Sequence, residues 1–168
     1  MITHEPDAST LAPAPAGRRL TVLTDQVIVR ETTEENEGAY ALLEFTTPPG
    51  GGFPPHAQRY DDLTIVVLDG IYDVLVGDRK TLLMGGDSVR VPRGTLGGFV
   101  NPGCQPSRLL AIVTPGVIHA QFLAEVGDRA GRPPWEADMG RILAVAPKYG
   151  IEFRYPDPDD GSSRVPQR

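Results

Sequence analysis

The stretch GGGFPPHAQRYDDLTIVVLDG, residues 50–70, joins a loop rich in glycine and proline to a histidine, a polar cluster and an apolar run. The run LTIVVL has the length of a strand and is rich in β-branched residues, and Gly70 supplies a turn after it. His56 and Gln58 are two residues apart, so they share one face of an extended segment. The stretch therefore predicts a β-strand that presents two polar side chains to the interior, followed by a buried strand.

Short apolar segments alternate with Gly, Pro and Asp from Leu20 to Thr114, which predicts an all-β sandwich or barrel. After Gly116 the pattern changes, because VIHAQFLAEVG and PWEADMGRILAVAPKYG repeat apolar residues at helical spacing. We expect Trp135 and Met139 to pack the second helix onto the barrel. The predicted organisation is a disordered tail over residues 1–17, a barrel over 18–116, and a helical C-terminal extension and tail over 117–168.

The bulk composition excludes several classes of partner. The chain has 168 residues and a net charge of −6, with no stripe of Lys and Arg, so no nucleic-acid partner is expected. Its longest apolar runs fall far short of the ~20 residues of a membrane helix, and the N-terminus does not read as a secretory signal. Cys104 is the only cysteine, which excludes an internal disulfide. We expect a cytoplasmic protein with a small-molecule partner and no membrane partner.

Three segments in order, PPGGGFPPHAQRYDDLTIVVLDG, GGDSVRVPRGTLGGFVNPG and LLAIVTPG, resemble the two signature motifs of the cupin superfamily. The resemblance is closest to small single-domain cupins of the quercetin-dioxygenase-like group. It covers residues 20–125 and includes Gly70, Gly86, Pro92, Gly94 and Asn101 at the family's spacing. It implies an antiparallel jelly-roll barrel (a double-stranded β-helix) with a ligand cavity inside, most often assembled as a homodimer.

The same resemblance implies a divalent metal held by three histidines and a glutamate. Carried over position by position, His56 matches the first histidine, whereas Gln58, Leu63 and Gly97 stand at the other three positions. Only one of the four positions keeps a good ligand, so we expect no metal and no other cofactor. A rescued site built from His56, Asp62 and His119 remains as an alternative.

Strand alternation points a mostly apolar set of side chains into the barrel, which is typical of a small-molecule site. The replacement of a histidine by Gly97 is expected to leave room for a larger substrate. His56 is the candidate general base or acid, with Gln58 binding a carbonyl or hydroxyl, Asp62 or Asp61 orienting the ring, and Tyr60 or Tyr72 donating a proton. The bland interpretation makes both aspartates solvated rim residues and His119 a surface or capping residue. The expected substrate-binding residues are Leu63, Ile65, Val67, Gly97 and Phe99.

Three functions follow from these observations. The first is a metal-independent cyclase, isomerase or dehydratase/lyase that acts on a medium-sized, largely apolar, polyketide-like metabolite by acid–base chemistry. The second is a metal-dependent, quercetinase-like dioxygenase with an unusual ligand set. The third is a cupin that binds a small molecule without chemistry. In the first of these, the helical extension is a candidate lid that excludes water from the pocket.

Overall fold

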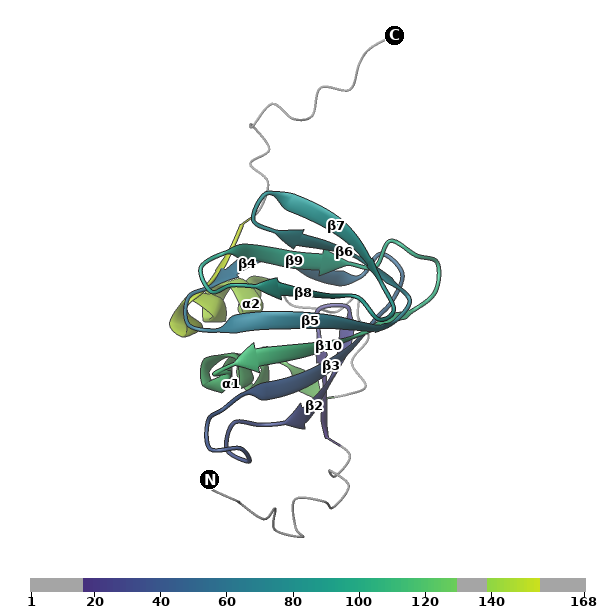
Figure 1. Cartoon of the computed structure of the whole chain (residues 1–168). Coiled ribbons are helices and arrows are strands. Elements are labelled where there is room, and N and C mark those ends of the chain that lie inside the picture. Colours follow the sequence, from purple (N-terminus) through teal and green to yellow (C-terminus); the bar gives the residue numbers. More distant parts are fainter. Residues whose placement is uncertain (1–16, 130–138, 155–168) are drawn as a thin grey trace, which may run out of the picture.

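The computed structural model describes residues 17–129 and 139–154, and its described strands form two antiparallel sheets that face each other (Figure 1). The seven-stranded sheet has the order β11-β1-β2-β3-β10-β5-β8, and the five-stranded sheet has the order β12-β4-β9-β6-β7. The strands are β1 (Arg18–Val22), β2 (Asp25–Glu31), β3 (Ala41–Thr47), β4 (Gly52–Gln58), β5 (Asp62–Asp69), β6 (Ile71–Val76), β7 (Arg79–Met84), β8 (Ser88–Val91), β9 (Leu96–Val100), β10 (Ser107–Thr114), β11 (Asp128–Arg129) and β12 (Ile151–Phe153). The predicted antiparallel jelly roll with helices near the C-terminus is confirmed.

Gly70 makes the corner at which the chain leaves one sheet for the other. It separates β5 from β6 and has a φ of +78°, a conformation that favours glycine. A Cβ at this position would lie 2.2 Å from the Ser107 hydroxyl oxygen, which accepts a hydrogen bond from the backbone N–H of Ile71. The glycine that ends the opening stretch is therefore required by both backbone angle and space.

The space between the two sheets is filled by aromatic side chains. Phe99 lies at the centre of this cluster, with its ring centroid 5.7 Å from that of Phe45, 5.6 Å from that of Tyr72 and 6.3 Å from that of Phe53. The first two contacts are edge-to-face, which is a favourable geometry for aromatic pairs. This packing occupies much of the interior in which the sequence led us to expect a ligand cavity.

The C-terminal extension contributes helices and edge strands to the barrel. It consists of α1 (Val117–Val126), α2 (Met139–Val145) and the 3-10 helix η3 (Ala146–Tyr149), together with β11, which pairs with β1, and β12, which pairs with β4. In Figure 1, α1 and α2 lie at the same end of the barrel strands. The predicted positions of Trp135 and of most of the N-terminal tail lie outside the described residues.

Candidate functional site

His56 projects inward from β4 and is held in one tautomer. A bulge between Phe53 and His56 places Pro54 and Pro55 where the strand makes no regular ladder bonds, which suits residues without an N–H. The Nδ1 of His56 lies 2.9 Å from the carbonyl oxygen of Pro54. Because a carbonyl can only accept, Nδ1 carries the proton and Nε2 keeps its lone pair.

The surroundings of the His56 ring are apolar. Its centroid lies 5.2 Å from that of Phe53 and 5.3 Å from that of Phe153, the residue of β12 that pairs with it. This burial lowers the pKa of His56 below its usual 6.5, and the hydrogen bond to Pro54 offsets only part of that effect. The imidazole is therefore neutral near pH 7.

Gln58 faces the Nε2 edge of this ring, and its own amide oxygen is an unpaired hydrogen-bond acceptor. Its Nε2 lies 3.2 Å from His56 Nε2, and an amide N–H is the only group of the pair that can donate there. The amide oxygen of Gln58 is buried and has no hydrogen-bond partner among the described residues. A buried acceptor without a donor costs free energy, so this oxygen marks a place for a donor from outside the chain.

The free space beside these two side chains is small. A cavity of about 10 Å³ lies against them, which is room for about one water molecule. Its lining residues are His56, Gln58, Asp61, Leu63, Val91, Pro92, Thr95 and Gly97. The large interior cavity expected from the sequence is therefore absent from the part of the barrel that the structure describes around His56.

Gly97 does not leave the expected room. A Cβ built on Gly97 would lie 2.8 Å from Cγ1 of Val91, which is closer than real Cβ contacts allow. Val91 of β8 thus occupies the volume that the missing side chain would have filled. The prediction that Gly97 opens space for a larger substrate is wrong, because it ignored compensation from the neighbouring strand.

Asp61 is buried and fastens a helix to the site, contrary to the expectation of a solvated rim residue. Its two carboxylate oxygens accept hydrogen bonds from the backbone N–H groups of Gly116 and His119, at 2.9 and 3.2 Å. These N–H groups belong to the start of α1, where a carboxylate is favoured by the helix dipole. Asp61 therefore anchors α1 against the connection that follows β4.

Asp62 and Tyr60 lie away from His56. Asp62 accepts hydrogen bonds from Arg90, at 3.1 Å, and from the backbone N–H of Arg93, at 2.8 Å. The bonds from Arg93 hold the pKa of Asp62 well below its usual range. Tyr60 is 46 % exposed and stacks under the guanidinium of Arg59. Neither side chain takes the orienting or proton-donating position predicted for it, because the turn after Gln58 directs both toward the rim.

His119 is buried, and its expected surface position is wrong. Its Nδ1 has no hydrogen-bond partner among the described residues. Burial, with a smaller contribution from the nearby His56, lowers the pKa of His119 from 6.5 to about 3. The sequence did carry a signal, because His119, Phe122, Leu123 and Val126 have the i, i+3, i+4, i+7 spacing of one helix face, and all four are buried.

The remaining predicted lining residues are part of the general core. Ile65 and Val67 are about 1 % exposed, and Phe99 belongs to the aromatic cluster between the sheets. Leu63 alone among the predicted apolar residues of β5 lines the small cavity. Whether any of these side chains contacts a substrate stays a prediction.

A second buried polar cluster lies at the start of β2. The Asp25 carboxyl is fully buried, and its Oδ2 has no partner among the described residues. Burial raises the pKa of Asp25 from 3.8 to about 7, and the hydroxyls of Thr24 and Thr47 offset only part of the rise. The Tyr72 hydroxyl donates to the Thr47 hydroxyl at 2.9 Å. This cluster was missed because the sequence TDQ reads as an ordinary polar turn.

Residues 43–113 match the profile of the family described as "Cupin domain". These residues form a cupin domain of the cupin superfamily. Solved structures with similar folds include a predicted oxalate decarboxylase from Thermotoga maritima, at 13% identity and a TM-score of 0.56, covering 61% of this chain and 95% of that one. An RmlC-like cupin from Shewanella frigidimarina gives 18% identity and a TM-score of 0.51, covering 58% and 82%. The Cnp3 cupin domain of Schizosaccharomyces pombe gives 18% identity and 0.51, covering 59% and 69%.

At sequence identities of 13–18%, the similarity to these solved structures establishes the fold alone. No curated protein sequence matches the chain. None of the helices in the described ranges combines the length and the apolar character that crossing a membrane requires.

The cupin domain does not offer the metal-ligand set that the resemblance implied. Within residues 17–129 and 139–154, no three His, Cys, Asp or Glu side chains come together in a way that could hold a metal ion. At the four carried-over positions, His56 Nε2 and the amide oxygen of Gln58 are atoms that could bind a metal, whereas the side chains of Leu63 and Gly97 supply no such atom. The rescued alternative also fails, because Asp62 is engaged by Arg90 and Arg93. The described donors therefore do not fit a three-histidine, one-glutamate centre.

Proposed function

We propose that this cupin domain is a metal-independent acid–base enzyme of the isomerase, cyclase or dehydratase/lyase type, in which His56 moves a proton of a largely apolar, polyketide-like metabolite. The observation that carries the proposal is the unpaired amide oxygen of Gln58, buried beside His56 Nε2, whose lone pair accepts only the hydrogen bond from the Gln58 amide. An acceptor and a base together suit a substrate that bears a hydroxyl next to a carbonyl. The proposal treats these residues as a former metal position that has been given another use.

The roles of the two side chains follow from their hydrogen bonds. The substrate hydroxyl would donate to the Gln58 oxygen, and the substrate carbonyl would accept from the Gln58 amide in place of His56. His56 Nε2 is then free to take a proton from the carbon between them, because burial keeps the ring neutral near pH 7. The Nδ1–H bond to Pro54 holds the ring in the orientation needed for this transfer.

Entry of a substrate requires an opening, since the present cavity holds about one water molecule. β12 is a strand of three residues at the edge of the sheet, and its Phe153 covers the His56 ring. Displacing β12 would break its three-residue ladder with β4 and uncover the buried side chain of Ile151. We therefore assign the C-terminal extension the role of a cover that leaves for substrate entry and returns to exclude water.

The proposal is tested by proton exchange, which needs no knowledge of the product. The protein is incubated in D2O with a panel of hydroxy ketones, diketones and keto acids, and loss of the α-proton signal is followed by NMR. We expect exchange on at least one compound that is unaffected by a chelator and reduced at least 100-fold in His56→Ala. Asp62→Asn, which alters the exposed pair with Arg93 instead of the cavity, serves as the matched control and should retain full exchange.

Two results would overturn the assignment. Full exchange in His56→Ala would show that His56 is not the base. About one equivalent of a transition metal per chain, measured by elemental mass spectrometry after chelator-treated buffer, together with exchange or oxygen uptake that depends on it, would favour a metal-dependent dioxygenase.

A second candidate is a cupin that binds a small molecule without chemistry, and the buried, unpaired amide oxygen of Gln58 suits this candidate as well. Its signature would be a compound that raises the melting temperature of the wild type but not of Gln58→Leu, and that is recovered unchanged after long incubation. Exchange catalysed by the wild type would eliminate this candidate.

A further inference from the structure

A hollow of about 550 Å³ lies on the outer face of the five-stranded sheet, and this volume is that of a small-molecule site. Along β6, Tyr72 is buried in the core, so Asp73 and Leu75, which alternate with it, point outward into the hollow. The apolar side chains of the lining include Leu23, Pro54, Pro55, Leu75, Val100 and Met139. Among the described residues, none lines both this outer hollow and the small cavity beside His56.

The floor of the outer hollow is bare because β9 has a glycine there. Gly97 faces Val91 in the interior, so its neighbour Gly98 faces outward. In the register of β6 and β9, Gly98 lies opposite Leu75, and a Cβ on Gly98 would lie 3.1 Å from the Cα of Pro55 on its other side. A side chain at Gly98 would therefore fill the space between β6 and β4. Its absence leaves a trough that crosses the sheet.

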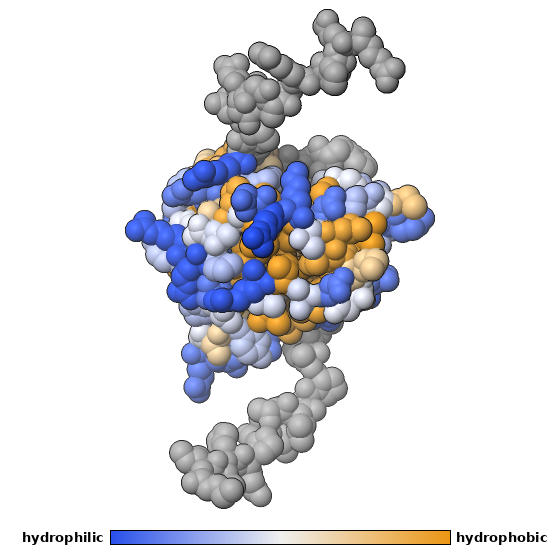
Figure 2. Space-filling model, turned by 45° about the horizontal axis from the view of Figure 1, so that its top comes forward, coloured by the Kyte–Doolittle hydropathy of each residue, from blue (hydrophilic) through white to orange (hydrophobic). Residues whose placement is uncertain are grey.

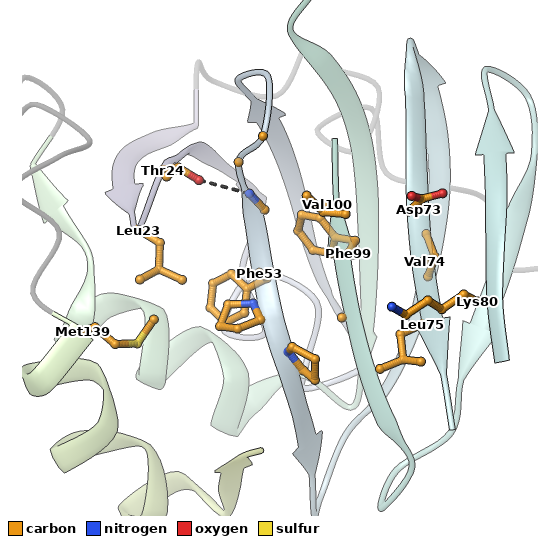
Figure 3. Close-up of a pocket in the computed structure, with 16 residues that line it drawn as sticks. Leu23, Thr24, Phe53, Asp73, Val74, Leu75, Lys80, Phe99, Val100 and Met139 are labelled. Atoms are coloured by element: carbon orange, nitrogen blue, oxygen red, sulfur yellow. Dashed lines mark hydrogen bonds between the residues drawn. The ribbon is translucent and has the colours of Figure 1, made fainter. Parts of the chain in front are cut away.

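The outer hollow has a charged end and an apolar end. Figure 2 turns the top of Figure 1 forward, and the orange area in the middle of that view shows apolar residues gathered there, with blue residues around it. Figure 3 shows Asp73 and Lys80 at one end of the hollow and Met139 at the other, with Phe53 and Val100 between them. Because β9 separates β6 from β4, the trough spans about 10 Å between these two strands. A ligand of matching shape has a charged head and an apolar tail.

Two opposite charges mark the head end of the outer hollow. Asp73 and Lys80 are the charged members of its lining among the described residues. Neither forms an ion pair with any other described residue. In the register of β6 and β7, Asp73 lies opposite Leu82, and Lys80 lies opposite Leu75. Asp73 and Lys80 are therefore diagonal neighbours on one face, about 7–8 Å apart.

We propose that the outer hollow binds a free α-amino acid with a long apolar side chain, whose ammonium group pairs with Asp73 and whose carboxylate pairs with Lys80. The two charged groups of an α-amino acid stand about 3 Å apart, and a charge-assisted hydrogen bond of about 2.8 Å at each end lets them bridge charges up to about 8 Å apart. That reach matches the spacing of the diagonal pair. A molecule with a single charge would leave one of the two protein charges unpaired and beside a like charge.

The length of the trough decides the length of the ligand's side chain. From the charged pair the trough runs over Gly98 to Pro54 and Pro55 of β4. Its span of about 10 Å accommodates a straight chain of roughly six carbon atoms beyond the α-carbon. A shorter side chain would leave the apolar end of the hollow uncovered, so affinity is expected to rise with chain length up to this limit.

The proposal is tested by isothermal titration calorimetry of the full chain with norvaline, norleucine and 2-aminooctanoic acid, at pH 7 and about 0.15 M salt. The three probes share one charged head and differ only in methylene groups. We expect the Kd to fall about four-fold with each added methylene, and therefore roughly 60-fold from norvaline to 2-aminooctanoic acid. Equal affinities for the three probes, or no binding of 2-aminooctanoic acid at about 2 mM, would overturn the proposal.

Charge-neutralising variants test the two ion pairs separately. Asp73→Asn and Lys80→Met should each weaken the binding of 2-aminooctanoic acid at least five-fold. Octanoate, which lacks the ammonium group, should bind Asp73→Asn more tightly than the wild type, and octylammonium should bind Lys80→Met more tightly, because each variant removes the charge that repels the probe. Asp78→Asn and Arg79→Met remove the same charges from exposed positions outside the lining, so as matched controls they should change the Kd less than two-fold.

Two further results would overturn the proposal. Binding of 2-aminooctanoic acid that is unchanged in both Asp73→Asn and Lys80→Met would show that the ligand binds elsewhere. Octanoate that binds the wild type as tightly as 2-aminooctanoic acid would show that the ammonium group has no partner and that the hollow takes a simple fatty acid. A fold defect cannot mimic the expected pattern, because it would weaken the binding of every probe, whereas each variant should bind one probe more tightly.

Discussion

Asp25→Asn should stabilise the protein, and the gain should grow with pH. The Asp25 carboxyl is fully buried with one oxygen unpaired, and its pKa is raised from 3.8 to about 7. At a pH between these two pKa values, Asp25 is protonated in the folded state but ionised in the unfolded state. The stability that this proton supplies is complete below pH 3.8 and is lost as the pH rises toward 7.

The size of the effect follows from the width of that pH range. Each unit of pKa difference corresponds to about 1.4 kcal/mol, so the full loss for Asp25 is about 4 kcal/mol above pH 7, of which about 3 kcal/mol is lost between pH 5 and 8. Asparagine has a similar shape and does not ionise. The stability of the variant minus that of the wild type should therefore rise by about 3 kcal/mol from pH 5 to pH 8.

Urea unfolding of both proteins at pH 5, 6, 7 and 8 measures this difference by linear extrapolation. Buried histidines titrate in the same range, but they are present in both proteins and cancel in the comparison. Asp78→Asn in the exposed turn between β6 and β7 is the control, and its effect should stay within about 0.5 kcal/mol at every pH. A difference between Asp25→Asn and wild type that does not change with pH would refute the reasoning, since it would show that Asp25 is ionised in the folded state.

His119→Leu should make the protein less sensitive to acid. The pKa of His119 is lowered to about 3, so the wild type loses about 2 kcal/mol of stability through this group from pH 6.5 to 4.5, and acid unfolding curves should show a smaller loss in the variant. Gly97→Ala should cost about 1–3 kcal/mol in thermal unfolding, because the new methyl group meets Val91, and the added substitution Val91→Ala should recover most of it. Asp61→Asn should lower the free energy of unfolding by about 1–2 kcal/mol, because Asp61 accepts hydrogen bonds from the backbone N–H groups of Gly116 and His119. The variant should also raise the rate of amide hydrogen exchange at these two residues. Unchanged protection there would contradict this role of Asp61.

The features readable from the sequence are those fixed by local rules. Alternation along the strands placed His56, Gln58, Ile65 and Val67 on the inside, and burial of all four agrees with it. The change from strand spacing to helical spacing after Gly116 corresponds to α1, which begins at Val117. Such patterns depend on neighbours within a few residues, so a single sequence contains them.

The features that could not be read depend on contacts between distant segments. Nothing near Gly97 shows that Val91 fills its space, because the contact is made across β8 and β9. The choice between Asp61 and Asp62 likewise depends on how the turn after β4 meets α1, more than 50 residues later. Asp61 is drawn inward by helix N–H groups, whereas Asp62 is held at the rim by Arg93.

The two buried polar clusters act on stability in opposite directions as the pH changes. His56 and His119 make the folded state lose stability as the pH falls below 6.5. Their pKa values are lowered by burial, so the unfolded chain binds protons at a pH at which the folded chain does not. Asp25 makes it lose stability as the pH rises toward about 7. Between pH 3.8 and 6.5 the effects of His119 and Asp25 oppose each other, and above pH 6.5 the loss of stability through Asp25 is no longer opposed by the histidines. In Asp25→Asn the descent above that pH should disappear while the acid side becomes steeper, a change of shape that a general packing effect of the substitution would not produce.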